Sequence, residues 1–276
     1  MCQTCGCTIT PGNRHLVEAE TTLFKGPRRQ GPSTTVEVLS NLLSANDREA
    51  AHNRAHLDQH GILAINLMSS PGSGKTSLLE ATIEALGDSC RIAVIEGDLA
   101  TENDAARIRA KGVPAIQITT GQACHLDAHM VHGALHQLDL TAIDVLFIEN
   151  VGNLVCPASF DLGHHLNVTL LSVTEGDDKP AKYPVMFRVA DLVLLTKADL
   201  LDVLGDDFKV EAAIRHVREL ANAAPVLTVS TRRTDGIGTF IDWIRDQRAA
   251  RKSGAQQRPR IVRDELTAGR GAVAHP

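Results

Sequence analysis

The chain has 276 residues, of which 43% are hydrophobic and 22% are charged, and its formal net charge is −5. This composition is typical of one or two globular domains, and its mild acidity gives no reason to expect nucleic acid or a membrane as a partner. No signal peptide is visible, and no apolar stretch approaches the roughly 18 residues that cross a bilayer. We therefore expect a cytoplasmic protein whose thiols stay reduced.

The first segment, residues 1–33, is predicted to be a flexible leader that carries Cys2, Cys5 and Cys7 in MCQTCGC. A reducing compartment disfavours a disulfide, and a redox CxxC would be expected at the start of a helix. A structural zinc site needs a fourth side-chain ligand, and only His15 is near. Three thiolates suit an open or square-planar nickel site instead, completed by the terminal amine or a backbone amide.

The rest of the chain predicts an α/β fold. A helix is expected over 34–60, because apolar residues such as Val36, Leu39 and Leu43 recur three and four apart. Over 61–248, apolar strands alternate with amphipathic helices, which predicts one domain with a mostly parallel sheet flanked by helices. Residues 249–276 are predicted to be a disordered tail. The expected strands are ILAINLMS, RIAVIEGD, PAIQITT, DVLFIEN, NVTLLSVTE, DLVLLTKAD and APVLTVS.

The loop after the first predicted strand reads SSPGSGKTS and predicts a phosphate site at a helix N-terminus. It matches the end of the pattern GxxxxGK[ST], although Ser69 stands where that pattern begins with glycine. Backbone N–H groups of such a loop surround the phosphates, the lysine reaches the β and γ oxygens, and the hydroxyl binds Mg²⁺. The predicted nucleotide contacts are Gly72, Ser73, Gly74, Lys75, Thr76 and Ser77.

Two further strands end in a carboxylate, at Asp98 and Glu149. Asp98 is the predicted Mg²⁺ ligand beside Thr76, with a helix cap as the alternative role. Glu149 begins Glu-Asn-Val-Gly, where many GTPases have Asp-x-x-Gly, so Gly152 is predicted to contact the γ-phosphate. With Lys75 and Thr76, these two carboxylates are the predicted catalytic residues.

Base selection is assigned to Thr196-Lys197-Ala198-Asp199, which is similar to the Asn-Lys-x-Asp element of G proteins. The Asp199 carboxylate can accept hydrogen bonds from both donors of guanine, the Lys197 stem can stack on the base, and adenine offers no such donor pair. Ser230, in VSTRR, is expected in the neighbouring base-contact loop. The sequence therefore predicts GTP and GDP as ligands and disfavours an ATP-dependent P-loop kinase.

Cys124, His125 and Cys156 form a second candidate metal site. Cys124 and His125 are expected near the first turn of a helix, where they can reach one ion only at an irregular turn or between two copies of the chain. Two thiolates and an imidazole suit Ni²⁺ and Zn²⁺ alike. Cys156 follows the predicted γ-phosphate segment, so nucleotide state and metal affinity are expected to be coupled.

Histidines recur along two predicted helices. His125, His129, His132 and His136 are expected to form one stripe, which is a solvated face or an interface and not core. Auxiliary metal contacts are an alternative role for this stripe. His52, His56 and His60 form a weaker row near the end of the N-terminal helix, for which a solvated face is also expected.

Six segments together resemble the HypB family of nickel-insertion GTPases, SIMIBI-class P-loop proteins of [NiFe]-hydrogenase maturation. They are MCQTCGC, SSPGSGKTSLLE, EGDLATENDAARI, CHLDAHMV, ENVGNLVCP and TKADL, in this order over nearly the whole chain. The resemblance implies GTP hydrolysis with Mg²⁺, a homodimer, a HypA-type metallochaperone partner and a hydrogenase large-subunit precursor as recipient. It also implies that Cys2, Cys5 and Cys7 bind nickel, and that Cys124, His125 and Cys156 bind Ni²⁺ or Zn²⁺ near the dimer interface.

Some relatives carry a polyhistidine store after the leader, but here only His15 lies between Cys7 and His52, so delivery is expected instead of storage. Two alternatives stay open from the sequence. One is a nickel or zinc buffer or sensor with vestigial nucleotide binding. The other is another SIMIBI metallochaperone GTPase, of the urease accessory type, although those relatives lack the CxxCGC leader.

Overall fold

The computed structural model describes residues 35–98, 103–121, 123–234 and 236–253, with the backbone alone over 35–42. The leader thiols Cys2, Cys5 and Cys7 and residues 254–276 lie outside the described residues. None of the described helices is long and apolar enough to cross a bilayer.

Seven parallel strands form one sheet in the order β3-β2-β4-β1-β5-β6-β7. Every residue of β1 and β4 is buried, because helices cover both faces of the sheet, and this explains the near-continuous apolar runs in the sequence. The seven predicted strands and the α/β class are confirmed. The strands are β1 (Leu63–Ser69), β2 (Ile92–Asp98), β3 (Ala115–Thr119), β4 (Val145–Glu149), β5 (Leu166–Ser172), β6 (Leu192–Thr196) and β7 (Val226–Thr228).

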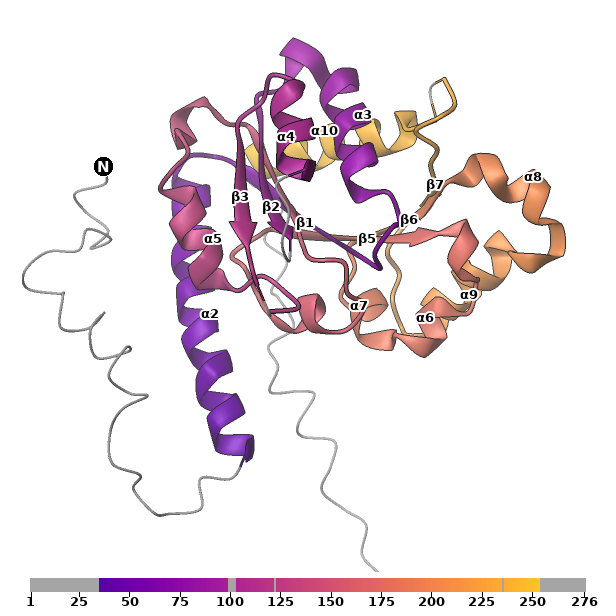
Figure 1. Ribbon diagram of the computed structural model, residues 1–276, viewed down its shortest axis with the longest axis horizontal. Coiled ribbons are helices and arrows are strands. Elements are labelled where there is room, and N and C mark those ends of the chain that lie inside the picture. The colour runs from indigo at the N-terminus through magenta and orange to yellow at the C-terminus, as the bar shows by residue number, and fades with distance from the viewer. Residues whose placement is uncertain (1–34, 99–102, 122, 235, 254–276) are drawn as a thin grey trace, which may run out of the picture.

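Helices cover the two faces of the sheet in different groups (Figure 1). Alternate residues of β1 show the division, because Ile65 packs with α3 and α10 whereas Ala64 packs with α2 and α5. The helices of the first face are α3 (Lys75–Leu86), α4 (Asn103–Ala110) and α10 (Gly238–Lys252). Those of the second face are α2 (Thr35–Gln59), α5 (Ala128–Leu135), α6 (Lys179–Lys182), α7 (Pro184–Arg188), α8 (Leu201–Leu204) and α9 (Val210–Glu219).

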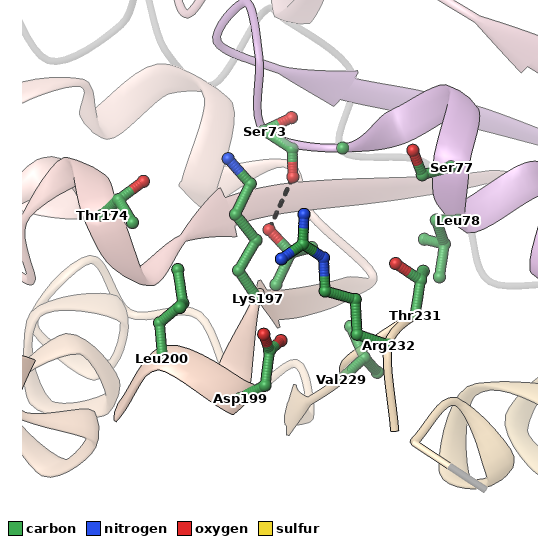
Figure 2. A pocket seen from close by; sticks show the side chains of 12 residues that line it. Ser73, Ser77, Leu78, Thr174, Lys197, Asp199, Leu200, Val229, Thr231 and Arg232 are labelled. Carbon is green, nitrogen blue, oxygen red and sulfur yellow. Dashed lines mark hydrogen bonds between the residues drawn. The ribbon is translucent and has the colours of Figure 1, made fainter. Parts of the chain in front are cut away.

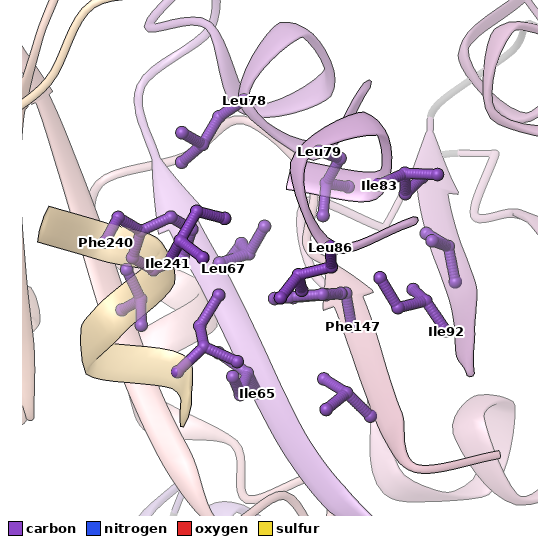
Figure 3. Packing of buried hydrophobic residues seen from close by; sticks show 14 of the residues in the cluster. Ile65, Leu67, Leu78, Leu79, Ile83, Leu86, Ile92, Phe147, Phe240 and Ile241 are labelled. Atoms are coloured by element: carbon purple, nitrogen blue, oxygen red, sulfur yellow. The ribbon is translucent and has the colours of Figure 1, made fainter. Parts of the chain in front are cut away.

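The core beneath α3 and α10 is mostly aliphatic (Figure 3). Phe240 and Ile241 of α10 lie over Ile65 and Leu67 of β1, and Phe147 of β4 closes the cluster toward β2. Burial of side chains of this size stabilises the fold by about 1.5–3 kcal/mol each relative to exposure. Because α3 packs on the sheet through this core, the position of the loop that precedes α3 is fixed relative to the strands.

The C-terminal helix extends further than the sequence predicts. The expected tail begins at residue 249, but α10 continues to Lys252. Two ion pairs hold its last turns: Arg248 lies 3.2 Å from Asp144, and Arg251 pairs with Asp58 at the end of α2. These partners are far away in the sequence, so the local composition of residues 249–252 did not reveal them.

Two adjacent buried histidines make the fold sensitive to acid. His165 Nδ1 accepts a hydrogen bond from the Ala64 amide of β1 at 2.9 Å, and its Nε2 donates to Asp58 at 3.0 Å. Burial lowers the pKa of His165 to about 3, and Arg251 adds to this effect; burial likewise lowers the pKa of His164 to about 3. Both imidazoles are therefore neutral in the folded protein at neutral pH.

We expect the contribution of these two histidines to the free energy of unfolding to be fully present above pH ~6.5 and to be lost as the pH drops toward ~3. Each histidine has a pKa of about 6.5 when unfolded, so the unfolded state binds more protons in this window, at a cost of about 2 kcal/mol per histidine by pH 5. Urea unfolding of the wild type and of His165→Asn at pH 7.5 and 5.0 isolates the part due to His165, because the other titrating groups contribute equally to both proteins. Asparagine at position 165 can still accept from the Ala64 amide but does not titrate, so His165→Asn should lose less free energy of unfolding than the wild type between pH 7.5 and 5.0. An equal change in both proteins would contradict the assignment.

Candidate nucleotide and metal sites

Because all seven strands are parallel, their carboxyl ends meet at one edge of the sheet, where open α/β sheets bind ligands. The loop between β1 and α3 lies at this edge. Gly72 and Gly74 adopt positive φ angles of 74° and 97°, which only glycine takes without strain, so the glycines of SSPGSGKTS are required by the backbone turn. The predicted phosphate loop is therefore a formed strand–loop–helix unit.

Ser69 stands where the pattern GxxxxGK[ST] has its first glycine, and its hydroxyl contacts Ser73 and Lys75 inside the loop. Its fully buried hydroxyl lies 2.9 Å from Lys75 Nζ and 2.5 Å from Ser73 Oγ. Lys75 is itself buried, and burial lowers the pKa of its ammonium group. The departure from the glycine pattern thus supplies an acceptor that holds Lys75 in the loop.

Three carboxylates converge beside the Thr76 hydroxyl. Thr76 Oγ1 donates to Glu149 at 2.9 Å, and ligand oxygens of Glu96, Asp104 and Glu149 lie within 4.8 Å of one another. Burial raises the pKa of Glu149 to about 7, although Lys75 and Thr76 oppose this, and burial followed by the Glu149 charge raises the pKa of Glu96 to about 8.

This oxygen cluster fits a magnesium ion. One buried oxygen of Glu96 and one of Glu149 have no hydrogen-bond partner among the described residues. Mg²⁺ prefers carboxylate and hydroxyl oxygens beside phosphate, and the bound ion would neutralise phosphate charge there. Thr76 and Glu149, both predicted from the sequence, belong to this cluster.

Asp98 occupies the carboxyl end of β2, next to β3, as the sequence predicts. The group of carboxylates beside Thr76, however, contains Glu96 from the same strand and does not include Asp98. The magnesium role of Asp98 therefore stays a prediction. Sequence reasoning missed Glu96 and Asp104; a signal for Glu96 exists, since it is a carboxylate inside an apolar strand whose register partner on β4 is Glu149.

A cavity of about 300 Å³ lies next to the phosphate loop. Figure 2 shows side chains that line it, Ser73 of that loop and Asp199 among them. Asp199 and Lys197 line it from the segment after β6, and Arg232 lines it from the loop after β7. Asp199 accepts a hydrogen bond from Ser230 Oγ at 2.6 Å, and this bond lowers the pKa of the carboxyl group. The carboxylate is therefore ionised and held in place, as an acceptor for two base donors needs to be.

Thr196, which stands where G proteins have asparagine, connects this cavity, the candidate base pocket, to the phosphate loop. Its hydroxyl donates to the Ser73 carbonyl at 2.7 Å, and Lys197 Nζ donates to the Gly72 carbonyl at 2.8 Å. Lys197 adopts a left-handed φ of 58°, unusual for a residue with a long side chain, which turns the chain so that Asp199 borders the cavity. The structure thus brings Thr196, Lys197, Asp199 and Ser230 together.

The second candidate site lies between the loop before α5, which carries Cys124 and His125, and the segment after β4, which carries Cys156. The ligand atoms of Cys124, His125 and Cys156 lie within 4.8 Å of one another, with 3.6 Å between Cys124 Sγ and His125 Nδ1. His125 stacks on Phe160, and burial lowers its pKa, which keeps the imidazole neutral and able to bind metal. Two thiols and a neutral imidazole fit a thiophilic ion such as Ni²⁺ or Zn²⁺.

Cys124 and His125 lie near the first turn of a helix, as expected, but just before it, and the irregular turn is the alternative that the structure shows. Helix α5 begins only at Ala128, because Asp127 caps it by accepting the Met130 amide at 2.8 Å. The irregular turn before the cap directs both side chains to one point, which adjacent helical residues could not reach.

The segment after β4 contacts both sites. Glu149 accepts from Thr76 of the phosphate loop, and a Cβ atom on Gly152 would lie 2.9 Å from Pro71 Cα, so this position requires glycine. On the other side, Asn150 Oδ1 accepts from the Leu126 amide at 3.1 Å, and Asn153 Nδ2 donates to the Cys124 carbonyl at 3.3 Å. Residues 149–153 therefore bridge the nucleotide loop and the metal loop.

The histidine stripe is not a solvated face along its whole length. His125 precedes the helix, and His129 and His136 are exposed, but His132 packs against α2, close to His52 and His56. The stripe therefore combines a packed position at His132 with exposed positions at His129 and His136. His56, for which a solvated face was expected, is buried.

The parallel sheet, the phosphate loop and the base pocket define a P-loop nucleotide-binding protein. The family model described as CobW/HypB/UreG, nucleotide-binding domain, matches residues 63–227. Two "Hydrogenase maturation factor HypB" proteins are similar, one from Azotobacter chroococcum mcd 1 (55% identity, 79% of this chain and 71% of that one) and one from Escherichia coli (strain K12) (52%, 78% and 73%). The crystal structure of HypB from Helicobacter pylori in complex with nickel has a TM-score of 0.72 and 42% identity, covering 78% of this chain and 99% of that one. This chain belongs to the HypB family of SIMIBI-class P-loop proteins.

Proposed function

We propose that this protein hydrolyses GTP and delivers nickel during hydrogenase maturation, with nucleotide state controlling the affinity of the Cys124/His125/Cys156 site. The names of the HypB relatives and the nickel complex of the Helicobacter pylori protein support the maturation role. The observation that carries the coupling is the bridge formed by residues 149–153. A γ-phosphate that moves this segment would also move the backbone of Cys124 through Asn153.

In this proposal Lys75, Thr76, Asp98 and Glu149 form the catalytic centre, where hydrolysis depends on positioning and charge stabilisation. Mg²⁺ is the resident ion of the oxygen cluster, and Ni²⁺ is the cargo, with Zn²⁺ as an alternative occupant of the cysteine site. The leader thiols Cys2, Cys5 and Cys7 would hold nickel before transfer.

Dimerisation and partners are also part of the proposal. Val155, beside Cys156, leaves 53% of its surface exposed, and an apolar side chain at this place suits a contact with a second copy that closes over the metal site. A HypA-type metallochaperone and a hydrogenase large-subunit precursor are the proposed partners. We propose a cytosolic location on the sequence alone.

The coupling is tested by nickel affinity with GDP and with a non-hydrolysable GTP analogue, measured by competition with a chromophoric chelator. A Cys2/Cys5/Cys7→Ala background removes the leader ligands from the titration. We expect at least a tenfold difference between the two nucleotide states, about 1.4 kcal/mol of coupling. Equal affinities in both states would show that the proposed coupling is wrong.

We expect Asn153→Ala to reduce this difference to less than threefold while nucleotide affinity stays unchanged, since the side chain contacts the Cys124 carbonyl and not the phosphate loop. Asn222→Ala is the matched control, because Asn222 also donates to backbone carbonyls, those of Phe187 and Ala190 before β6. If both variants change the coupling equally, the bridge is not its route.

A further inference from the structure

Four histidines from two helices meet on the second face of the sheet, and we call them the interhelix histidine cluster. They are His52 and His56 on α2, His132 on α5, and His136 at the C-terminal cap of α5. The ring centres are 4.5 Å apart for His132 and His136, 4.8 Å for His52 and His56, and 5.0 Å for His52 and His132. The ring centre of His56 lies 6.1 Å from the ring centres of both His132 and His136. The cluster shares no residue with the Cys124/His125/Cys156 site.

The tautomer of His132 follows from its neighbour Asn53. Asn53 is fully buried, and its Nδ2 donates to the Ala128 and Leu162 carbonyls at 2.8 and 3.1 Å. Its Oδ1 must therefore be the atom that faces His132 Nδ1 at 2.9 Å, and an amide oxygen only accepts. His132 Nδ1 thus carries the proton, and Nε2 presents a lone pair, the arrangement by which outer hydrogen bonds orient metal-binding histidines.

The nitrogen that faces this lone pair is at a metal-bridging distance. His136 Nε2 lies 3.0 Å from His132 Nε2. Two nitrogens bound to one ion at about 2.1 Å and at a right angle are about 3.0 Å apart, and about 3.4 Å apart at the tetrahedral angle. Without an ion, the Nε2–H of a neutral His136 explains the same distance by donating to His132 Nε2. When both nitrogens bind an ion, His136 changes tautomer and carries its proton on Nδ1.

The other two histidines offer further ligands. His56 is 8% exposed, and its Nε2 is buried without a hydrogen-bond partner among the described residues, which is costly unless a ligand satisfies it. His52 lies with Glu49 and His132 in a group whose ligand atoms are within 4.8 Å of one another. When two imidazoles bind one ion with metal–nitrogen bonds of about 2.1 Å, their ring centres are about 4.5 Å apart at an N–metal–N angle of about 90°. They are about 6.4 Å apart at an angle of about 180°. All five measured separations in the cluster fall in this range.

We propose that the interhelix histidine cluster binds one divalent cation of borderline softness, Ni²⁺ or Zn²⁺, between α2 and α5. Imidazole nitrogens select such ions over Mg²⁺, and Glu49, 3.4 Å from the protonated His132 Nδ1, adds negative charge beside the cluster. Burial lowers the pKa of His132 to about 4, and the neighbouring histidines add to this, so that imidazole is neutral and competent at neutral pH. The ion would join α2, which follows the leader, to α5, which follows the metal loop.

The test uses the full chain with its other metal thiols removed, a background we call the five-cysteine variant. Its substitutions are Cys2→Ala, Cys5→Ala, Cys7→Ala, Cys124→Ser and Cys156→Ser. We expect it to bind one equivalent of Zn²⁺ or Ni²⁺ in calorimetric titration and to melt at a higher temperature with Zn²⁺. Bound Co²⁺ should show no thiolate charge-transfer band. Absence of binding, or a thiolate band, would overturn the proposal.

His136→Gln in this background should weaken binding at least 100-fold and abolish the Zn²⁺-dependent rise in melting temperature. His136 is exposed, so this variant should fold normally. His129→Gln is the matched control on the same helix, since His129 is exposed and outside the cluster, and it should leave the affinity unchanged. Unchanged affinity in His136→Gln, or equal loss in both variants, would overturn the assignment. The result is independent of GTP hydrolysis and of nickel coupling at the cysteine site.

Discussion

Replacing Lys75 by alanine should lower GTP hydrolysis at least 100-fold, a loss of about 2.7 kcal/mol of transition-state stabilisation. Lys75 is the buried cation of the phosphate loop, and Ser69 holds its ammonium group at 2.9 Å where phosphate oxygens would lie. Alanine removes the positive charge that stabilises the charge on the transferred phosphoryl group. Phosphate release at saturating GTP measures the effect.

Lys111→Ala is the control for this substitution, because Lys111 lies outside the nucleotide site and pairs with Glu84 on the surface. It should keep hydrolysis within twofold of the wild type. Activity of Lys75→Ala within threefold of the wild type would show that this loop is not the hydrolytic centre. No turnover by the wild-type protein would favour the buffer or sensor alternative, in which nucleotide binding is vestigial.

Asp199→Asn should exchange guanine for xanthine specificity. The Asp199 carboxylate borders the base cavity and is held by Ser230 at 2.6 Å, so its two oxygens can accept from guanine N1–H and the 2-amino group. Asparagine keeps one acceptor and offers one donor, which matches xanthine, with N1–H and a 2-oxo group. We expect GTP affinity to fall at least 100-fold and XTP to bind more tightly than GTP, measured by displacement of a fluorescent nucleotide.

Asp202→Asn is the matched control, since the same substitution three residues later alters a side chain that is 89% exposed and pairs with Arg233. It should leave both affinities unchanged. Loss of GTP binding by Asp199→Asn without a gain for XTP would indicate that Asp199 supports the loop and does not read the base.

Local patterns in the sequence were sufficient for the strands and the phosphate loop. An apolar run such as LAINLMS predicts a strand buried on both faces of a sheet. The segment GSGK predicts a turn before a helix that requires glycine. Both signals lie within a few neighbouring residues, so no knowledge of distant contacts was needed. Thr196, Lys197 and Asp199 were found in the same way, as one short segment after an apolar strand.

What failed or was missed depended on contacts between distant segments. The length of α10 is set by ion pairs to Asp144 and Asp58. The irregular turn at Cys124, one of two alternatives that the sequence left open, is held by Asn153 from the segment after β4. Neither set of partners can be ranked from composition, because many acids and amides elsewhere in the chain could serve equally well.

The sequence by itself determined the α/β class and the phosphate loop, and it predicted the base-selecting segment and the thiol and imidazole ligands, since each depends on a short run of residues. Only the tertiary structure decided the strand order, which places Glu96 beside Glu149, and the packing of α2 on α5, which brings His56 to His132. The physical reason is that strand order and helix packing are chosen by the total burial of the chain, whereas a phosphate loop is formed by its own backbone.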